Sequence, residues 1–307
     1  MNMKKVFRFL SLSAALLFAA AGCVTESARA PIPNERIGVC SWSWREPMTG
    51  VAKEMDAAGV KGIHLALGPF IAPDRRHGAA ETADALAFVK DKIAKGEWKL
   101  MCTMIGTVGE DYSTLDSIRE TGGIVPDRNW EANKRIVTAG ARLTQELGCE
   151  YMSTHAGFLD ESDPVALKKF VERVTWMRDE CKKFNVTLIL ESGQETAEDL
   201  VKFMTMVPGV GINFDPANMI LYAKGRPREA LQILFPYIRQ VHVKDARKTR
   251  TPGTWGTETP WGKGEVGGYV FLAELEALGY KGNYVVEREG GNDRKSDIQL
   301  AIQSLRD

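Results

Sequence analysis

The sequence predicts an α/β protein, a (β/α)8 barrel, and two observations lead to this fold class. Short apolar, β-branched runs alternate with longer segments whose apolar residues recur at helical spacing. Strands that alternate with helices form a parallel sheet with right-handed crossovers, and eight such units in about 270 residues are the number that closes a barrel. A doubly wound open sheet stays as the alternative, because eight strands do not by themselves require closure.

The first half of the chain contains four of these units. Strands are expected at residues 36–42, 60–66, 98–105 and 150–154. Helices are expected at residues 48–58, 80–94 and 128–147. A fourth helix begins at Asp163-Pro164, where Asp is a favourable N-cap and Pro is well tolerated in the first turn.

The second half repeats the pattern. Strands are expected at residues 186–191, 210–215, 238–244 and 283–287, and the helices that follow them at residues 196–206, 228–234, 268–278 and 293–305. We therefore expect one barrel domain over residues 36–307.

The composition gives no sign of a nucleic-acid partner. The 307 residues include 40 Lys and Arg and 40 Asp and Glu, so the formal net charge is zero. A neutral chain without a basic stripe does not indicate a nucleic-acid partner. Hydrophobic residues make up 44% and charged residues 26% of the chain, which is typical of a soluble globular domain.

The N-terminus reads as an export signal over residues 1–22. A short basic region precedes the charge-free apolar run 9–21, which is shorter than the roughly 20 residues that span a bilayer. The run ends in Ala20-Ala21-Gly22-Cys23, which resembles the lipobox of bacterial lipoproteins and implies a lipid on the thiol of Cys23. A plain signal peptide cut near residues 28–30 is the alternative. Residues 23–35 would be a tether.

This signal predicts an exported bacterial lipoprotein, on the periplasmic side of the membrane or anchored in the outer membrane. Its contact with the membrane would be the lipid anchor only. An exported chain can form disulfides, yet Cys40 and Cys102 lie in apolar runs and Cys149 lies just before another. We therefore expect buried free thiols at the four remaining cysteines: Cys40, Cys102, Cys149 and Cys181. The absence of a CxxC motif or a Cys/His cluster in the sequence argues against a structural zinc site.

Four residues capable of binding a metal fall at or near the ends of the last four predicted strands: Glu191, Asp215, His242 and Glu287. In a barrel the carboxyl ends of the strands converge on one face. Charged residues can simply mark where strands stop, and a histidine in a strand is often a core residue. However, His64 and His155 also fall on strand or strand-end positions. We therefore predict a metal site at this face.

Five short segments from residue 36 onward resemble, in order, motifs of the sugar phosphate isomerase/epimerase family, the xylose isomerase-like barrels that include D-tagatose 3-epimerase-type enzymes. They are Val186–Glu191, Asn213–Asn218, Val241–Asp245, Trp261–Val266 and Val286-Glu287. In that family the Glu, Asp, His and Glu of these motifs bind one divalent metal. The resemblance carries these roles onto Glu191, Asp215, His242 and Glu287.

The resemblance also implies a reaction. Three carboxylates and one imidazole favour Mn²⁺, Mg²⁺ or Co²⁺ and do not exclude Zn²⁺. Such a cation would polarise the carbonyl of a hydroxyketone and stabilise an enediolate. The metal-bound glutamates of the epimerases then move a proton, which assigns acid and base roles to Glu191 and Glu287. We therefore expect the protein to be a metal-dependent isomerase or epimerase that acts on a non-phosphorylated sugar, keto-sugar or cyclitol.

Some positions depart from the family pattern. Asn218 stands where many relatives have a His, His64 stands where their second strand ends in a Glu, and Lys244 replaces a small or polar residue. Together with His155, these residues are expected to contact substrate.

The same site could instead support a lyase or dehydratase that acts on 3-keto sugars or inososes. If the protein is not an enzyme, the alternative is a non-catalytic carbohydrate-binding lipoprotein. The predicted partner is a small sugar, no nucleic acid is expected, and a homo-oligomeric state is left open.

Overall fold

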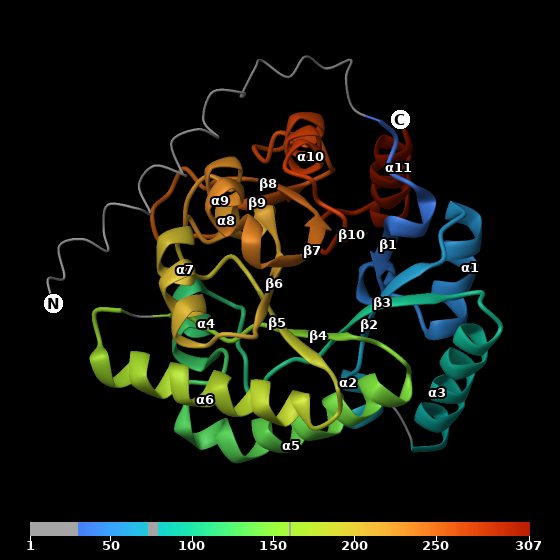
Figure 1. Ribbon diagram of the computed structural model, residues 1–307. Helices are drawn as coiled ribbons and strands as arrows, with labels where there is room; N and C mark the ends of the chain where they lie inside the picture. Colours follow the sequence, from blue (N-terminus) through green and yellow to red (C-terminus); the bar gives the residue numbers. More distant parts are fainter. Residues whose placement is uncertain (1–29, 73–78, 160) are drawn as a thin grey trace, which may run out of the picture.

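Eight parallel strands close into a barrel, and most of the helices lie around its outside (Figure 1). The computed structural model describes residues 30–72, 79–159 and 161–307. The predicted signal peptide and Cys23 lie outside the described residues. No helix among the described residues has the length and hydropathy that a membrane span requires.

The strand order around the barrel is β1-β10-β7-β6-β5-β4-β3-β2, so the first and last strands of the chain pair and close the sheet. The strands are β1 (Ile37–Cys40), β2 (Gly62–Ala66), β3 (Lys99–Met104), β4 (Tyr151–Thr154), β5 (Thr187–Glu191), β6 (Gly211–Phe214), β7 (Ile238–Val243) and β10 (Asn283–Val286). Closure confirms the predicted barrel and rules out the open sheet. Each predicted strand boundary is correct to within two residues.

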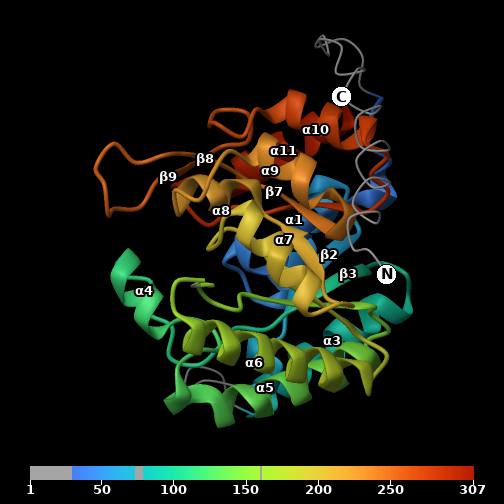
Figure 2. The same ribbon diagram turned by 60° about the vertical axis from the view of Figure 1, so that its left-hand side comes forward.

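Eight helices correspond to the predicted ones: α1 (Met48–Ala58), α3 (Ala79–Ala94), α5 (Asp127–Glu146), α6 (Pro164–Lys182), α7 (Ala197–Met206), α9 (Pro227–Leu234), α10 (Gly268–Ala277) and α11 (Arg294–Arg306). The sequence did not predict the short elements in the loops: α2 (Gly68–Ile71), α4 (Leu115–Thr121), α8 (Pro216–Leu221), and the antiparallel pair β8 (Asp245–Arg247) and β9 (Thr257–Thr259). Figure 2 shows the β8–β9 loop extending outward on the same side of the molecule as α4.

The apolar core lies between the strands and the surrounding helices, where residues such as Phe170, Phe203 and Leu231 are fully buried. The inside of the barrel is different, because it holds polar side chains, among them His64, Asn213 and Gln240. Barrel interiors are usually filled by branched apolar residues. A polar interior below the carboxyl ends of the strands therefore points to the site that these residues support. The four cysteines of the barrel are free and buried, as predicted.

Candidate metal centre

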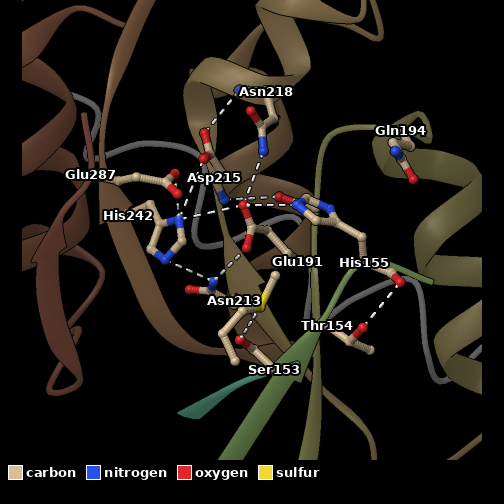
Figure 3. Close-up of polar contacts among 12 residues, drawn as sticks. Ser153, Thr154, His155, Glu191, Gln194, Asn213, Asp215, Asn218, His242 and Glu287 are labelled. Atoms are coloured by element: carbon tan, nitrogen blue, oxygen red, sulfur yellow. Dashed lines mark hydrogen bonds and ion pairs between the residues drawn. The ribbon is translucent and has the colours of Figure 1, made fainter. Parts of the chain in front are cut away.

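Four side chains meet at the carboxyl ends of four adjacent strands (Figure 3). Glu191 is the last residue of β5, Asp215 follows β6, His242 is the next-to-last residue of β7, and Glu287 follows β10. One nitrogen or oxygen atom from each lies within 4.8 Å of the others. The fold thus brings together all four residues that were predicted as metal ligands.

The imidazole of His242 is at the centre of this group. Its Nδ1 atom lies 3.2 Å from Oε2 of Glu287, 3.4 Å from Oδ2 of Asp215 and 3.5 Å from Oε1 of Glu191. Ligands at about 2.0–2.2 Å from a divalent cation lie roughly 3–3.5 Å from one another. Both the spacing and the oxygen-rich donor set therefore fit a single divalent cation.

Asp215 is positioned by the helix that it begins. It is the N-cap of α8, where its Oδ1 atom accepts a hydrogen bond of 2.8 Å from the backbone N–H of Asn218, and Pro216 occupies the first turn. Its own N–H donates to Oγ of Ser192. The helix cap uses Oδ1, and Oδ2 is directed toward His242.

Glu191 is held from two sides. Nδ2 of Asn218 donates to its Oε1 atom at 3.0 Å, and Nε2 of His155 lies 3.4 Å from the same oxygen. The loop after β5 can approach α8 because residue 193 is glycine with φ near +137°, and a Cβ there would lie 2.3 Å from Cβ of Asn218. Gly193 therefore permits the contact between Asn218 and Glu191.

Glu287 is held by two donors. Nε1 of Trp42 donates to its Oε1 atom at 2.7 Å, and Nζ of Lys244 donates to its Oε2 atom at 2.9 Å. Lys244 also donates to Glu289 at 2.9 Å and to Oδ1 of Asn218 at 3.3 Å. Asn218 and Lys244 are 4% and 3% exposed. Their polar groups thus hold candidate ligands in place, and their contact with substrate stays a prediction.

Burial and charge shift the ionisation of the site. Burial raises the pKa of Asp215 to about 6, although Lys244 opposes this shift. Burial also acts to raise the pKa of Glu287, but the charges of Lys244 and His242 outweigh it and hold that pKa well below its usual range. The acidic groups around His242 outweigh burial and raise the pKa of its imidazole well above the usual value. A cation would therefore compete with a proton for Nδ1.

His64 does not lie at the open face, where a substrate contact was predicted. It is 0% exposed and packs below the four ligands, with its ring centroid 5.4 Å from that of His242. Burial lowers its pKa to about 3. The sulfur of Cys40 and ring nitrogens of His64 and His242 lie within 4.8 Å of one another. The barrel thus assembles a Cys/His cluster that residue spacing in the sequence did not reveal.

His155 keeps the position expected of a substrate contact. It follows β4, its side chain is 18% exposed, and its Nδ1 atom has no hydrogen-bond partner among the described residues. Glu195 is a buried acid that the sequence did not single out. It is 6% exposed, its Oε2 atom has no hydrogen-bond partner among the described residues, and burial raises its pKa to about 7. Because Glu195 lies in a polar loop, the sequence did not indicate that its side chain is buried.

Comparisons with known proteins agree with this fold. A family model described as a xylose isomerase-like TIM barrel matches residues 52–307. The chain is 25% identical over 196 residues to the uncharacterized protein YihM of Escherichia coli strain K12, a match that covers 56% of this chain and 59% of that protein. The chain thus spans less than two thirds of the length of this curated relative.

Among solved structures, a xylose isomerase domain protein from Planctomyces limnophilus has a TM-score of 0.77 and 28% identity, covering 88% of this chain and 96% of that chain. A xylose isomerase-like TIM barrel protein from Mycobacterium smegmatis in complex with magnesium has a TM-score of 0.60 and 20% identity, covering 85% and 90%. An L-ribulose 3-epimerase has a TM-score of 0.62 and 16% identity, covering 88% and 95%. The last two likenesses concern the fold alone.

Proposed function

Because this chain belongs to the family of xylose isomerase-like TIM barrels, we propose that it is a divalent-metal-dependent isomerase or epimerase of a small sugar. The observation that carries the proposal is the cluster of Glu191, Asp215, His242 and Glu287, all buried at the carboxyl face of the barrel. A module that only binds carbohydrate has no need of these four side chains together. The substrate class is a non-phosphorylated sugar, keto-sugar or cyclitol, because the export signal predicted at the N-terminus would keep the chain away from cytoplasmic sugar phosphates.

A divalent cation held by these four residues would polarise the carbonyl group of the substrate and stabilise the negative charge that develops on its oxygen. The protein itself moves the proton. The carboxylates of Glu191 and Glu287 come from different strands and lie 3.5 Å and 3.2 Å from Nδ1 of His242 (Figure 3). One carboxylate can remove the proton from the carbon next to the carbonyl, and the other can return it on the opposite face.

The neighbouring side chains orient these two carboxylates. The N–H of Trp42 and the ammonium of Lys244 hold Glu287, and the amide of Asn218 holds Glu191. Nδ1 of His155 is buried and has no hydrogen-bond partner among the described residues, so a substrate hydroxyl that reached it would satisfy it. This arrangement keeps both carboxylates in fixed positions before the substrate binds.

The test is a deuterium-exchange screen in D₂O with the metal-loaded protein and a panel of free sugars, 3-keto sugars and inososes. We expect deuterium from the solvent to be incorporated at the carbon next to the carbonyl of one of these substrates. Glu191→Gln and Glu287→Gln should each lower the exchange rate by about 10²–10⁴-fold. Full exchange in both variants would contradict the assignment of acid and base. Loss of water from the substrate would instead identify a lyase, and binding without exchange a carbohydrate-binding protein.

A further inference from the structure

Below the candidate ligands, the interior of the barrel holds a chain of hydrogen-bonding groups that ends on His242. Nε2 of His242 lies 3.2 Å from Nδ1 of His64, and Nε2 of His64 lies 2.9 Å from Oγ of Ser153. All three side chains are 0% exposed, so their hydrogen bonds are made inside the protein. The three residues come from β7, β2 and β4, which only the closed barrel brings together.

Ser153, at the far end of this series of hydrogen-bonding groups, determines where the protons lie. Oγ of Ser153 lies 3.2 Å from the carbonyl oxygen of Thr103 and 2.9 Å from Sδ of Met104, and both of these atoms can only accept. The hydroxyl proton of Ser153 is therefore donated to these acceptors. Its oxygen is then free to accept a hydrogen bond from Nε2–H of His64. A neutral imidazole has one donor and one acceptor. Nδ1 of His64 is then an acceptor that faces His242.

We propose that His64 is a positioning residue that accepts a hydrogen bond from Nε2–H of His242 and so keeps the proton on that nitrogen. The lone pair of Nδ1 of His242 is then directed at the three carboxylates, where the cation would bind. A ligand histidine usually donates its other N–H to a carboxylate, a carbonyl or water. In this protein a second, neutral histidine takes that place. The inference rests on the metal-binding part of the proposed function.

Two amides compete for the same ring nitrogens. Nε2 of Gln240 lies 3.1 Å from Nδ1 of His64, and Nδ2 of Asn213 lies 3.0 Å from Nε2 of His242. If Asn213 donated to His242, the proton of His242 would sit on Nδ1 and block cation binding. The two arrangements place that proton on opposite ring nitrogens, so spectroscopy can distinguish them.

The first test is nitrogen NMR of the full chain with ¹⁵N-labelled histidine and bound Mg²⁺. We expect the proton of His242 on Nε2 and a coupling through the hydrogen bond to Nδ1 of His64. A proton on Nδ1 of His242, or a proton on Nδ1 of His64, would overturn the proposal. This measurement needs no variant, so a failure of a variant to fold does not affect it.

The second test compares two substitutions of similar shape by calorimetric titration with Mn²⁺. His64→Leu removes the acceptor and should weaken Mn²⁺ binding by about 10–100-fold. His64→Asn keeps an acceptor oxygen near the position of Nδ1 and should recover most of that loss. The control is Cys181→Ala, because Cys181 is an equally buried cysteine that lies on α6, away from these hydrogen-bonding groups. Unchanged affinity in His64→Leu would overturn the inference, whereas a wild-type protein that binds no Mn²⁺ would contradict the proposed function itself.

Discussion

The ammonium group of Lys244 lies 2.9 Å from Oε2 of Glu287, and both side chains are almost completely buried. Lys244 therefore supplies the positive charge that compensates the carboxylates before any cation binds. With His242 neutral, the three carboxylates and one ammonium leave two negative charges, which match the charge of a divalent cation. We therefore expect Lys244 to stabilise the metal-free protein and at the same time to weaken its attraction for a cation.

Replacement of Lys244 by Met should separate these two effects. The free energy of unfolding of the metal-free protein should fall by about 3–5 kcal/mol, because Glu287 loses its buried partner. The affinity for Mn²⁺ should rise by about tenfold or more, since two unit charges about 4 Å apart interact by roughly 4 kcal/mol at an effective dielectric of 20. Urea denaturation and calorimetric titration measure the two quantities.

The matched control is Lys281→Met, because Lys281 is exposed and lies just before β10, at the opposite end of the strand from Glu287. It should leave both quantities unchanged. Weaker binding of Mn²⁺ by Lys244→Met would show that the ammonium helps to assemble the site and does not compete with the cation.

Asp215 has a structural role and a predicted metal-binding role, and two substitutions distinguish them. Asn caps helices as well as Asp does, so Asp215→Asn should keep α8 and should not lower the thermal stability of the metal-free protein at pH 7.5. Asp215→Ala should lose about 1 kcal/mol through the missing cap. Both variants should lose Mn²⁺ binding in titrations. Tight binding of Mn²⁺ by Asp215→Asn would exclude this carboxylate as a ligand.

The sequence was sufficient to predict the barrel and the four clustered residues, because strand periodicity and position at a strand end are local properties. The partners of those residues could not be predicted in the same way. Trp42 donates to Glu287 across 245 positions of sequence, which requires β1 to pair with β10. The inward position of His64 depends on the register of β2 within the closed barrel, which residue patterns alone do not reveal.

Glu195 should make stability depend on pH. Burial raises its pKa in the folded protein from the usual value of 4.5 to about 7. Between these two values the folded state binds more protons than the unfolded state, so the contribution of this group to stability is greatest at low pH and is lost as the pH rises toward 7. Glu195→Gln should therefore be more stable than the wild type at pH 8, by an amount on the order of 1–3 kcal/mol. The difference should vanish near pH 4.

Chemical denaturation at several pH values measures this difference. Glu198→Gln is a suitable control, because Glu198 is an exposed acid in the first turn of α7. A pH-independent difference between Glu195→Gln and the wild type would contradict the assignment.

Cys23 should carry the lipid anchor that the N-terminal sequence predicts. Expression of the full chain in a bacterial host with labelled fatty acid should give a labelled membrane protein, and Cys23→Ser should lose the label while its export continues. Cys181→Ser serves as a control, because Cys181 is buried inside the barrel domain. Equal labelling of the wild type and Cys23→Ser would contradict the prediction and favour the plain signal peptide.

We expect one divalent cation to be bound by four side chains together: Glu191, Asp215, His242 and Glu287. The most direct measurement is an anomalous-difference map from a crystal of the protein loaded with Mn²⁺. We expect a single strong peak at about 2.0–2.4 Å from one atom of each of the four side chains. A crystal that shows no peak at this position, or whose peak lies instead among Cys40, His64 and Nε2 of His242, would contradict it.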